Sequence, residues 1–210
     1  MDRMKRVEWI YSSADNRQLA ERYDHWATDY DADLNEAFGW SGPQYAVELF
    51  VRYVSTDARV LDAGAGTGLV GQLLAQRGYR DLIAMDLSQG MLEEARKKNA
   101  YQEFYQMVMG DPLDFNDDSF DAVISVGVLT MNHAPADSLD ELIRITRPDG
   151  YIVFSLRPDV YRDNGFKEKQ DSLEADGKWR LVEVSQEFQP LPWGEPDICH
   201  QIWVYQVNSL

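Results

Sequence analysis

The spacing of apolar positions changes along the chain and separates a helical beginning from a longer part of alternating strands and helices. A helix is predicted over 13–34, because apolar residues recur there at intervals of three and four, at Leu19, Tyr23, Trp26 and Tyr30. A break at 39–43 contains two glycines and a proline. The pattern of 44–53 then predicts a second helix.

From residue 59 onward, short apolar runs alternate with helical patterns. The runs predict strands over 59–64, 81–86, 104–111, 120–129 and 150–157. Helices are predicted between them over 69–78, 89–99 and 136–150. The last two strands, over 178–188 and 200–208, have a proline-rich loop between them instead of a helix, so we expect them to pair antiparallel at one edge.

Strands separated by helices imply parallel βαβ units. We therefore expect an α/β protein with a doubly wound, Rossmann-like, mostly parallel sheet of seven strands and an antiparallel edge strand. Residues 1–57 would form a helical N-terminal extension, or lid, that belongs to the same single domain as the core over 58–210. The length of 210 residues suits one domain.

The net charge of −16 disfavours nucleic acid and anionic lipid as partners, because the average surface repels both. No stretch approaches the ~20 apolar residues of a membrane span, so we expect a cytoplasmic protein. A single cysteine and three scattered histidines give no metal-ligand spacing, so no metal is expected. The choice between monomer and homodimer stays open.

The segment VLDAGAGTG, residues 60–68, is the main candidate for ligand binding. Glycines that follow a buried strand let backbone N–H groups approach a ligand closely, at the edge of the sheet where such folds bind their ligands. A phosphate-binding P-loop is excluded, because no Lys-Ser or Lys-Thr pair follows the last glycine. Leu69 stands where the dinucleotide fingerprint requires its third glycine, and this mismatch counts against a dinucleotide site.

Three acids at strand ends refine the ligand. Asp86 lies about twenty residues after the loop, where a carboxylate accepts hydrogen bonds from ribose hydroxyls. Asp111 could accept a hydrogen bond from an adenine amino group, with Leu113 packing on the ring. Asp62 places negative charge where a pyrophosphate would lie, which favours a ligand with an ammonium and a sulfonium.

Residues 60–157 resemble the core of class I S-adenosylmethionine-dependent methyltransferases. The first motif of that family is similar to VLDAGAGTG, its ribose-binding acid to MDLS, and its adenine-binding turn to GDPLDF. The segments FDAVISVGVL and LIRITRPDGYIVFSLR resemble the strand and the helix–turn–strand that follow. YDHWATDYDADL is similar to the leading helix of the subgroup named after the Williams–Beuren syndrome region, which closes over the cofactor.

The resemblance implies S-adenosylmethionine as cofactor and S-adenosylhomocysteine as product. The cofactor-binding residues it implies are Tyr30, Asp62, Gly64, Ala65, Gly66, Asp86, Leu87, Asp111, Pro112, Leu113 and Val126. Tyr30 would lean over the sulfonium, and Val126 would pass under the methionine part.

Residues for the methyl acceptor are matched by no specific motif. His133 is the candidate general base, although a histidine in a loop is more often simply solvated. Trp26, Arg157 and Trp193 are candidate substrate contacts; Trp26 could equally be core packing, and Arg157 could pair only with Asp159.

No NPPY-like tetrapeptide follows the fourth strand, which argues against methylation of amide nitrogens or of adenine in nucleic acid. The negative charge agrees with this, so we expect a small-molecule acceptor. Three alternatives stay open: a protein methyltransferase, a non-catalytic protein that binds the cofactor, and an NAD-dependent oxidoreductase.

Overall fold

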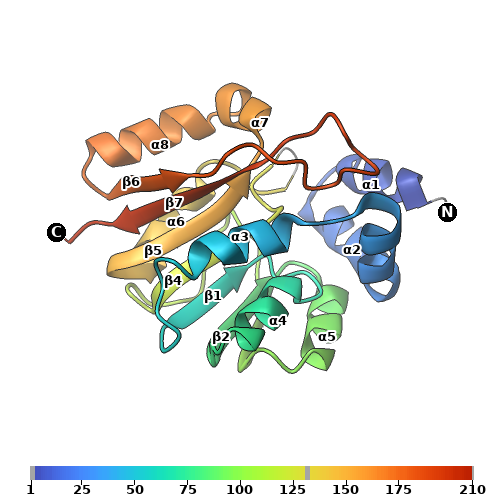
Figure 1. Ribbon diagram of the computed structural model, residues 1–210, viewed down its shortest axis with the longest axis horizontal. Helices are drawn as coiled ribbons and strands as arrows, with labels where there is room; N and C mark the ends of the chain where they lie inside the picture. Colours follow the sequence, from blue (N-terminus) through green and yellow to red (C-terminus); the bar gives the residue numbers. More distant parts are fainter. Residues whose placement is uncertain (1–2, 131–132, 210) are drawn as a thin grey trace.

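The computed structural model describes residues 3–130 and 133–209 and contains one sheet of seven strands (Figure 1). The strands are β1 (Arg59–Ala63), β2 (Asp81–Asp86), β3 (Glu103–Gln106), β4 (Phe120–Ser125), β5 (Thr146–Leu156), β6 (Trp179–Val184) and β7 (Gln201–Val207). The helices are α1 (Arg3–Tyr11), α2 (Asn16–Asp33), the π-helix η1 (Leu34–Phe38), α3 (Gly42–Phe50), α4 (Leu69–Gln76), α5 (Gln89–Lys97), α6 (Ser138–Ile145), α7 (Pro158–Asp163) and α8 (Phe166–Ala175).

The expected fold class is confirmed. The strand order is β3-β2-β1-β4-β5-β7-β6, and the first five strands in this order are parallel. β7 runs antiparallel to both of its neighbours, β5 and the edge strand β6. The order reverses between β1 and β4, and this is the place where a doubly wound sheet opens a crevice at its carboxyl edge.

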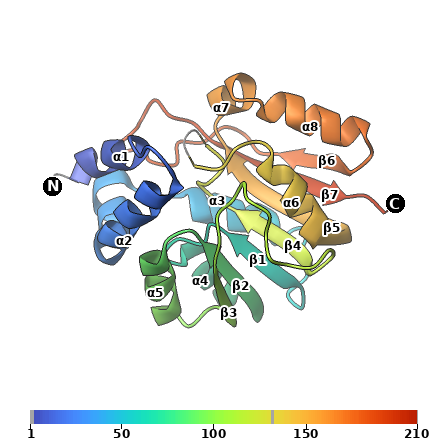
Figure 2. The same ribbon diagram turned by 180° about the vertical axis from the view of Figure 1, so that it is seen from behind.

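Successive side chains of the central strands enter two separate apolar clusters. Val60 packs with α3, α4 and α5 on one face of the sheet, and the next residue, Leu61, packs with α6, α7 and α8 on the other. Both side chains are fully buried, which contributes about 1.5–3 kcal/mol each to the free energy of unfolding. Figures 1 and 2 show the two helical layers from opposite sides. Burial on both faces explains why these strands read as continuous apolar runs.

The first helices form a third apolar cluster beside the carboxyl edge of the sheet. Leu19 and Trp26 of α2 are buried there with Ile10 of α1 and Phe38 of η1. Asp15 caps α2, because its side chain accepts a hydrogen bond from the backbone N–H of Gln18 at 2.8 Å. No helix in the described part of the chain is long and apolar enough to cross a membrane.

The described part of the structure contains four helices that the apolar pattern did not predict: α1, η1, α7 and α8. It also ends β3 at Gln106, five residues before the expected end of that strand, and begins β5 directly after α6. The chain after β3 therefore forms irregular structure over 107–119.

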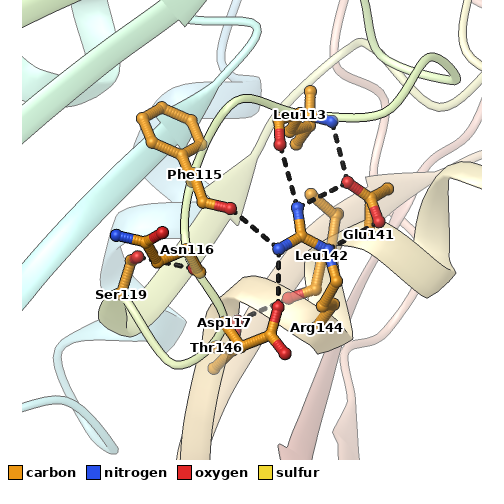
Figure 3. A network of polar contacts seen from close by, with 9 residues as sticks. All are labelled: Leu113, Phe115, Asn116, Asp117, Ser119, Glu141, Leu142, Arg144 and Thr146. Atoms are coloured by element: carbon orange, nitrogen blue, oxygen red, sulfur yellow. Dashed lines mark hydrogen bonds and ion pairs between the residues drawn. The ribbon is translucent and has the colours of Figure 1, made fainter.

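Arg144, in the last turn of α6, holds this irregular segment against the helix (Figure 3). Its guanidinium donates to the backbone carbonyls of Leu113 at 2.9 Å and Phe115 at 2.8 Å. It also pairs with Asp117 at 2.8 Å and Glu141 at 2.7 Å. The planar fork of arginine is needed to reach these acceptors at once.

We expect Arg144→Lys to lower the free energy of unfolding by about 1–2 kcal/mol, because a lysine keeps the charge and loses most of the hydrogen bonds. Urea denaturation measures the change. Arg17→Lys is the control, since the Arg17 side chain is 87% exposed. Equal stability of the two variants would contradict this role for Arg144.

Candidate functional site

A cavity with two lobes lies at the carboxyl ends of the central strands. The β2–β3 lobe is lined by residues that follow β2 and β3, together with α2 and α5: Asn16, Leu19, Met85, Asp86, Leu87, Met91, Met107, Val108 and Met109. The β5–β7 lobe is lined by α1, by the loop after β1, by the segment between η1 and α3, by the end of β5 and by the β6–β7 connection; its residues include Tyr11, Trp40, Ala65, Ser155, Arg157, Glu195 and His200. The lobes share a wall made of Tyr23, Tyr30, Gly64, Gly66, Val126, Gly127 and His133.

The glycine loop forms the floor between the lobes. Gly64, Gly66 and Gly68 all have positive φ, at 84°, 53° and 87°, which favours glycine. A Cβ on Gly64 would lie 2.2 Å from Cγ2 of Val128, so no larger residue fits there. A Cβ on Gly66 would meet no atom within 4 Å, so the backbone of Gly66 faces open space. A ligand can therefore approach the loop closely at this point.

Asp86 ties the loop to the end of β2. Its Oδ2 accepts a hydrogen bond from the backbone N–H of Gly66 at 2.8 Å, and its Oδ1 accepts one from Ser88 at 2.9 Å. Burial raises the pKa of Asp86 to about 6, although these hydrogen bonds lower it. Each oxygen keeps a second lone pair, and the residue lines the β2–β3 lobe beside Leu87.

Asp62 has a different environment from the one we expected. Its Oδ2 accepts a hydrogen bond from the Tyr101 hydroxyl at 2.5 Å, and the same hydroxyl accepts one from the backbone N–H of Gly71 at 3.0 Å. Asp62 lines neither lobe. Its Oδ1 is buried and accepts no hydrogen bond from the described residues. Burial raises the pKa of Asp62 to about 7.

Helix α2 covers the wall between the lobes. Tyr30 lines both lobes, and Trp26 lines the β5–β7 lobe with its ring centroid 4.8 Å from that of Tyr30. Trp26 is buried, and its Nε1 donates to Asp33 at 2.8 Å. Both rings therefore have fixed positions at the cavity.

Two further acids anchor α2 to the core. Asp24 accepts hydrogen bonds from the Ser88 hydroxyl at 2.6 Å and from the backbone N–H of Gly90 at 2.8 Å. Asp31 accepts one from the Thr67 hydroxyl and pairs with Lys98 at 2.6 Å. α2 is thus joined to the glycine loop and to both ends of α5.

The predicted adenine-binding turn lies outside the cavity. Asp111 and Pro112 are exposed, and Leu113 is buried in the apolar cluster beneath α6. The hydrogen bonds of Leu113 to Glu141 and Arg144 hold it there (Figure 3). The structure instead brings 107–109 to the β2–β3 lobe.

His133 and Arg157 both line the β5–β7 lobe. The hydroxyl of Tyr23 lies 2.9 Å from Nε2 of His133, so the histidine contacts the N-terminal helices. Burial raises the pKa of Tyr23 well above its usual value. Arg157 donates through Nε and Nη2 to both carboxylate oxygens of Asp159, at 3.0 and 2.6 Å. The expected Arg157–Asp159 pair therefore coexists with a position at the cavity.

Trp193 was expected to contact the methyl acceptor, and the structure contradicts this. Its side chain is 69% exposed and lies over Gly39, and the residue does not line the cavity. Neighbours in the same β6–β7 connection line the cavity in its place, among them Leu191, Glu195 and Ile198. These residues could not be recognised in the sequence, because a proline-rich connection has no periodicity that indicates which side chains point inward. Among the residues that the structure describes, no group of three or more His, Cys, Asp or Glu could hold a metal ion.

The raised pKa of Asp62 makes a prediction for stability. A carboxyl whose pKa is about 7 when folded and 3.8 when unfolded stabilises the fold below about pH 4 and loses this contribution as pH rises through 7. We expect Asp62→Asn to remove this loss. From pH 4 to pH 8, the free energy of unfolding of the wild type should fall by about 2–4 kcal/mol relative to the variant.

Urea denaturation across this pH range measures the difference. Asp163→Asn, at an exposed site, is the control and should follow the wild-type profile. Parallel profiles for wild type and Asp62→Asn would contradict the prediction.

Comparisons with known proteins show the family of the chain. A family model described as a methyltransferase domain matches residues 61–154. The chain is 32% identical to human methyltransferase-like protein 27 over 181 residues, which cover 83% of this chain and 73% of that protein. It is 44% identical to the demethylmenaquinone methyltransferase of Clavibacter sepedonicus over 106 residues, which cover 48% of this chain and 42% of that enzyme.

Solved structures show the same fold at low identity. An S-adenosylmethionine-dependent methyltransferase from Methanosarcina mazei superposes with a TM-score of 0.63 at 15% identity, over 77% of this chain and 98% of that one. The [4+2]-cyclase SpnF superposes with a TM-score of 0.70 at 14% identity, over 94% and 98%. These likenesses concern the fold alone. The family model and the human relative match in sequence, and they show the family. The chain belongs to the class I S-adenosylmethionine-dependent methyltransferases.

Proposed function

We propose that this protein transfers the methyl group of S-adenosylmethionine to a small-molecule acceptor bound in the β5–β7 lobe. The observation that carries this proposal is the shared wall of the two lobes, with Tyr30 and Gly66 between them. A cofactor in one lobe and an acceptor in the other would meet at this wall.

The β2–β3 lobe suits the adenosine part of the cofactor. We assign the ribose hydroxyls to Asp86, because its oxygens have free lone pairs at the lobe surface. We assign the adenine to the apolar surface of Leu87 and 107–109, in place of Asp111, Pro112 and Leu113.

The glycine loop suits the amino acid part. Gly64, Ala65 and Gly66 line the cavity together with Val126, and the open space at Gly66 leaves room for a ligand against the backbone. Tyr30 would face the sulfonium, where an aromatic ring contributes about 0.5–2 kcal/mol. We assign Asp62 a positioning role through Tyr101, because it lines neither lobe and its carboxylate accepts a hydrogen bond from the Tyr101 hydroxyl.

When bound, S-adenosylmethionine supplies an electrophilic methyl group whose leaving group is a neutral thioether. No acid is then needed, so the main task of this chain is to align the acceptor and exclude water. Trp26, Tyr30 and Trp40 supply the apolar enclosure of the β5–β7 lobe.

We propose His133 as the group that takes a proton from an acceptor that arrives protonated. In the neutral tautomer that this role requires, Nε2 carries the proton and donates it to the oxygen of the Tyr23 phenol, which stays protonated because burial raises its pKa, and Nδ1 is the basic nitrogen. This contact orients the ring at the shared wall.

The concave lobe and the relatives support a small molecule over a protein as acceptor. The demethylmenaquinone methyltransferases among the relatives are named for a small-molecule acceptor.

A protein methyltransferase would label proteins in a cell extract given methyl-labelled cofactor. A non-catalytic protein would bind the cofactor and label nothing.

Cofactor binding is tested by calorimetric titration with S-adenosylhomocysteine, S-adenosylmethionine and NAD. We expect Asp86→Asn to weaken binding of S-adenosylhomocysteine by about ten- to a hundredfold, because the hydrogen-bonding carboxylate loses its charge. Asp163→Asn should bind like the wild type. Binding of NAD alone would make the protein an oxidoreductase and overturn the proposal.

The role of His133 is tested by His133→Gln with any acceptor that the wild type methylates. A lost general base should lower kcat by about a hundredfold or more. The affinity for S-adenosylhomocysteine should stay close to that of the wild type. A variant with full kcat would show that His133 only supports the wall.

A further inference from the structure

The β5–β7 lobe contains a carboxylate that has no partner within the described residues. Glu195 lies in the β6–β7 connection, which reaches across to the N-terminal helices (Figure 1). Its backbone is fixed in a turn, since its N–H donates to Leu191 at 2.8 Å and its carbonyl accepts from Ile198 at 3.1 Å. Its side chain is half-buried, and among the described residues no hydrogen bond or ion pair within 4.0 Å involves its carboxylate. Burial raises the pKa of this group, although the positive charge of Arg157 lowers it.

The other charges at this end of the lobe compensate Glu195 only in part. Arg157 is the one cation among the lining residues that the structure describes, and it acts on Glu195 at longer range while Asp159 binds its guanidinium through two hydrogen bonds. His200 is neutral near pH 7, because burial lowers its pKa to about 4. With Arg157 positive and both Asp159 and Glu195 negative, this end of the lobe carries a net charge of about −1.

The walls of the same lobe favour a cation. Five aromatic side chains line it: Tyr11, Tyr23, Trp26, Tyr30 and Trp40. An aromatic face attracts an ammonium group, and the attraction grows when water is excluded. The rest of the wall is apolar and includes Val7, Ile10 and Leu191.

We propose that the methyl acceptor carries an ammonium group that pairs with Glu195, attached to an apolar or aromatic body that fills the lobe. This inference rests on the proposed function, which places the acceptor in this lobe. It assigns Glu195 as a specificity-determining residue and leaves the methylated atom of the acceptor open.

An acceptor with a carboxylate fits the same lobe less well. It would have to share the Arg157 guanidinium with Asp159 and would lie near the like charge of Glu195. A neutral acceptor would leave Glu195 half-buried without a partner, which costs free energy. An ammonium group avoids both costs.

The test is calorimetry on the full chain saturated with S-adenosylhomocysteine, so that no transfer occurs. The probes are 2-phenylethylamine, 2-phenylethanol and 3-phenylpropionate, which share an aromatic body and differ in charge. We expect the amine to bind about tenfold more tightly than the alcohol, and the carboxylate more weakly than both.

Glu195→Gln should bring the amine to the affinity of the alcohol and leave the alcohol unchanged. Glu187→Gln is the matched control, because it makes the same change at an exposed position of the same connection. It should bind all three probes like the wild type.

The inference is overturned if the amine does not bind, binds no better than the alcohol, or keeps its affinity in Glu195→Gln. In each case binding of S-adenosylhomocysteine stays intact, so the proposed function survives. Failure of S-adenosylhomocysteine itself to bind would overturn the proposed function instead.

Discussion

The candidate site depends on the attachment of the glycine loop to the end of β2. The backbone N–H groups of Gly64 and Ala65 both donate to the carbonyl of Met85, at 2.7 and 2.9 Å, and that of Gly66 donates to Asp86. These bonds hold the chain in left-handed turns, which glycine adopts without the penalty that a side chain brings. The same bonds bring the acid that we assign to the ribose next to the loop that we assign to the amino acid part.

The other parts of the site are arranged around this attachment. Asp31 of α2 binds Thr67 in the glycine loop, and Asp24 binds the N-terminal end of α5. α2 thereby brings Tyr30 over the loop. The β6–β7 connection closes the far side and is held by hydrogen bonds, from Ser41 to Pro190 and from Trp193 to Phe38. Acidic side chains make many of these contacts, so part of the strongly negative charge serves the site.

The sequence predicted the central strands well, because strands buried on both faces produce uninterrupted apolar runs. Val60 and Leu61 are examples, since each enters a different face of the core. α8 was missed because its segment, FKEKQDSLEA, is mostly polar. Its buried residues, Phe166, Gln170 and Leu173, follow helical spacing, but Gln170 is polar and interrupts the apolar pattern. Propensity alone gives little signal for such a surface helix.

The site was predictable where a local motif sets the geometry, as at Gly64, Gly66 and Asp86. It was not predictable where distant contacts decide. Leu113 follows β3 as an adenine-binding residue would, but Arg144, 31 residues later, holds it beneath α6. Glu195 reaches the cavity only because the β6–β7 connection folds back onto the N-terminal helices.

The most direct test of this account is a crystal structure with S-adenosylhomocysteine. We predict the ribose hydroxyls within hydrogen-bonding distance of Asp86, the adenine against 107–109, and the homocysteine along Gly64–Gly66. An adenine bound between Asp111 and Leu113, with 107–109 turned away, would contradict the two-lobe account.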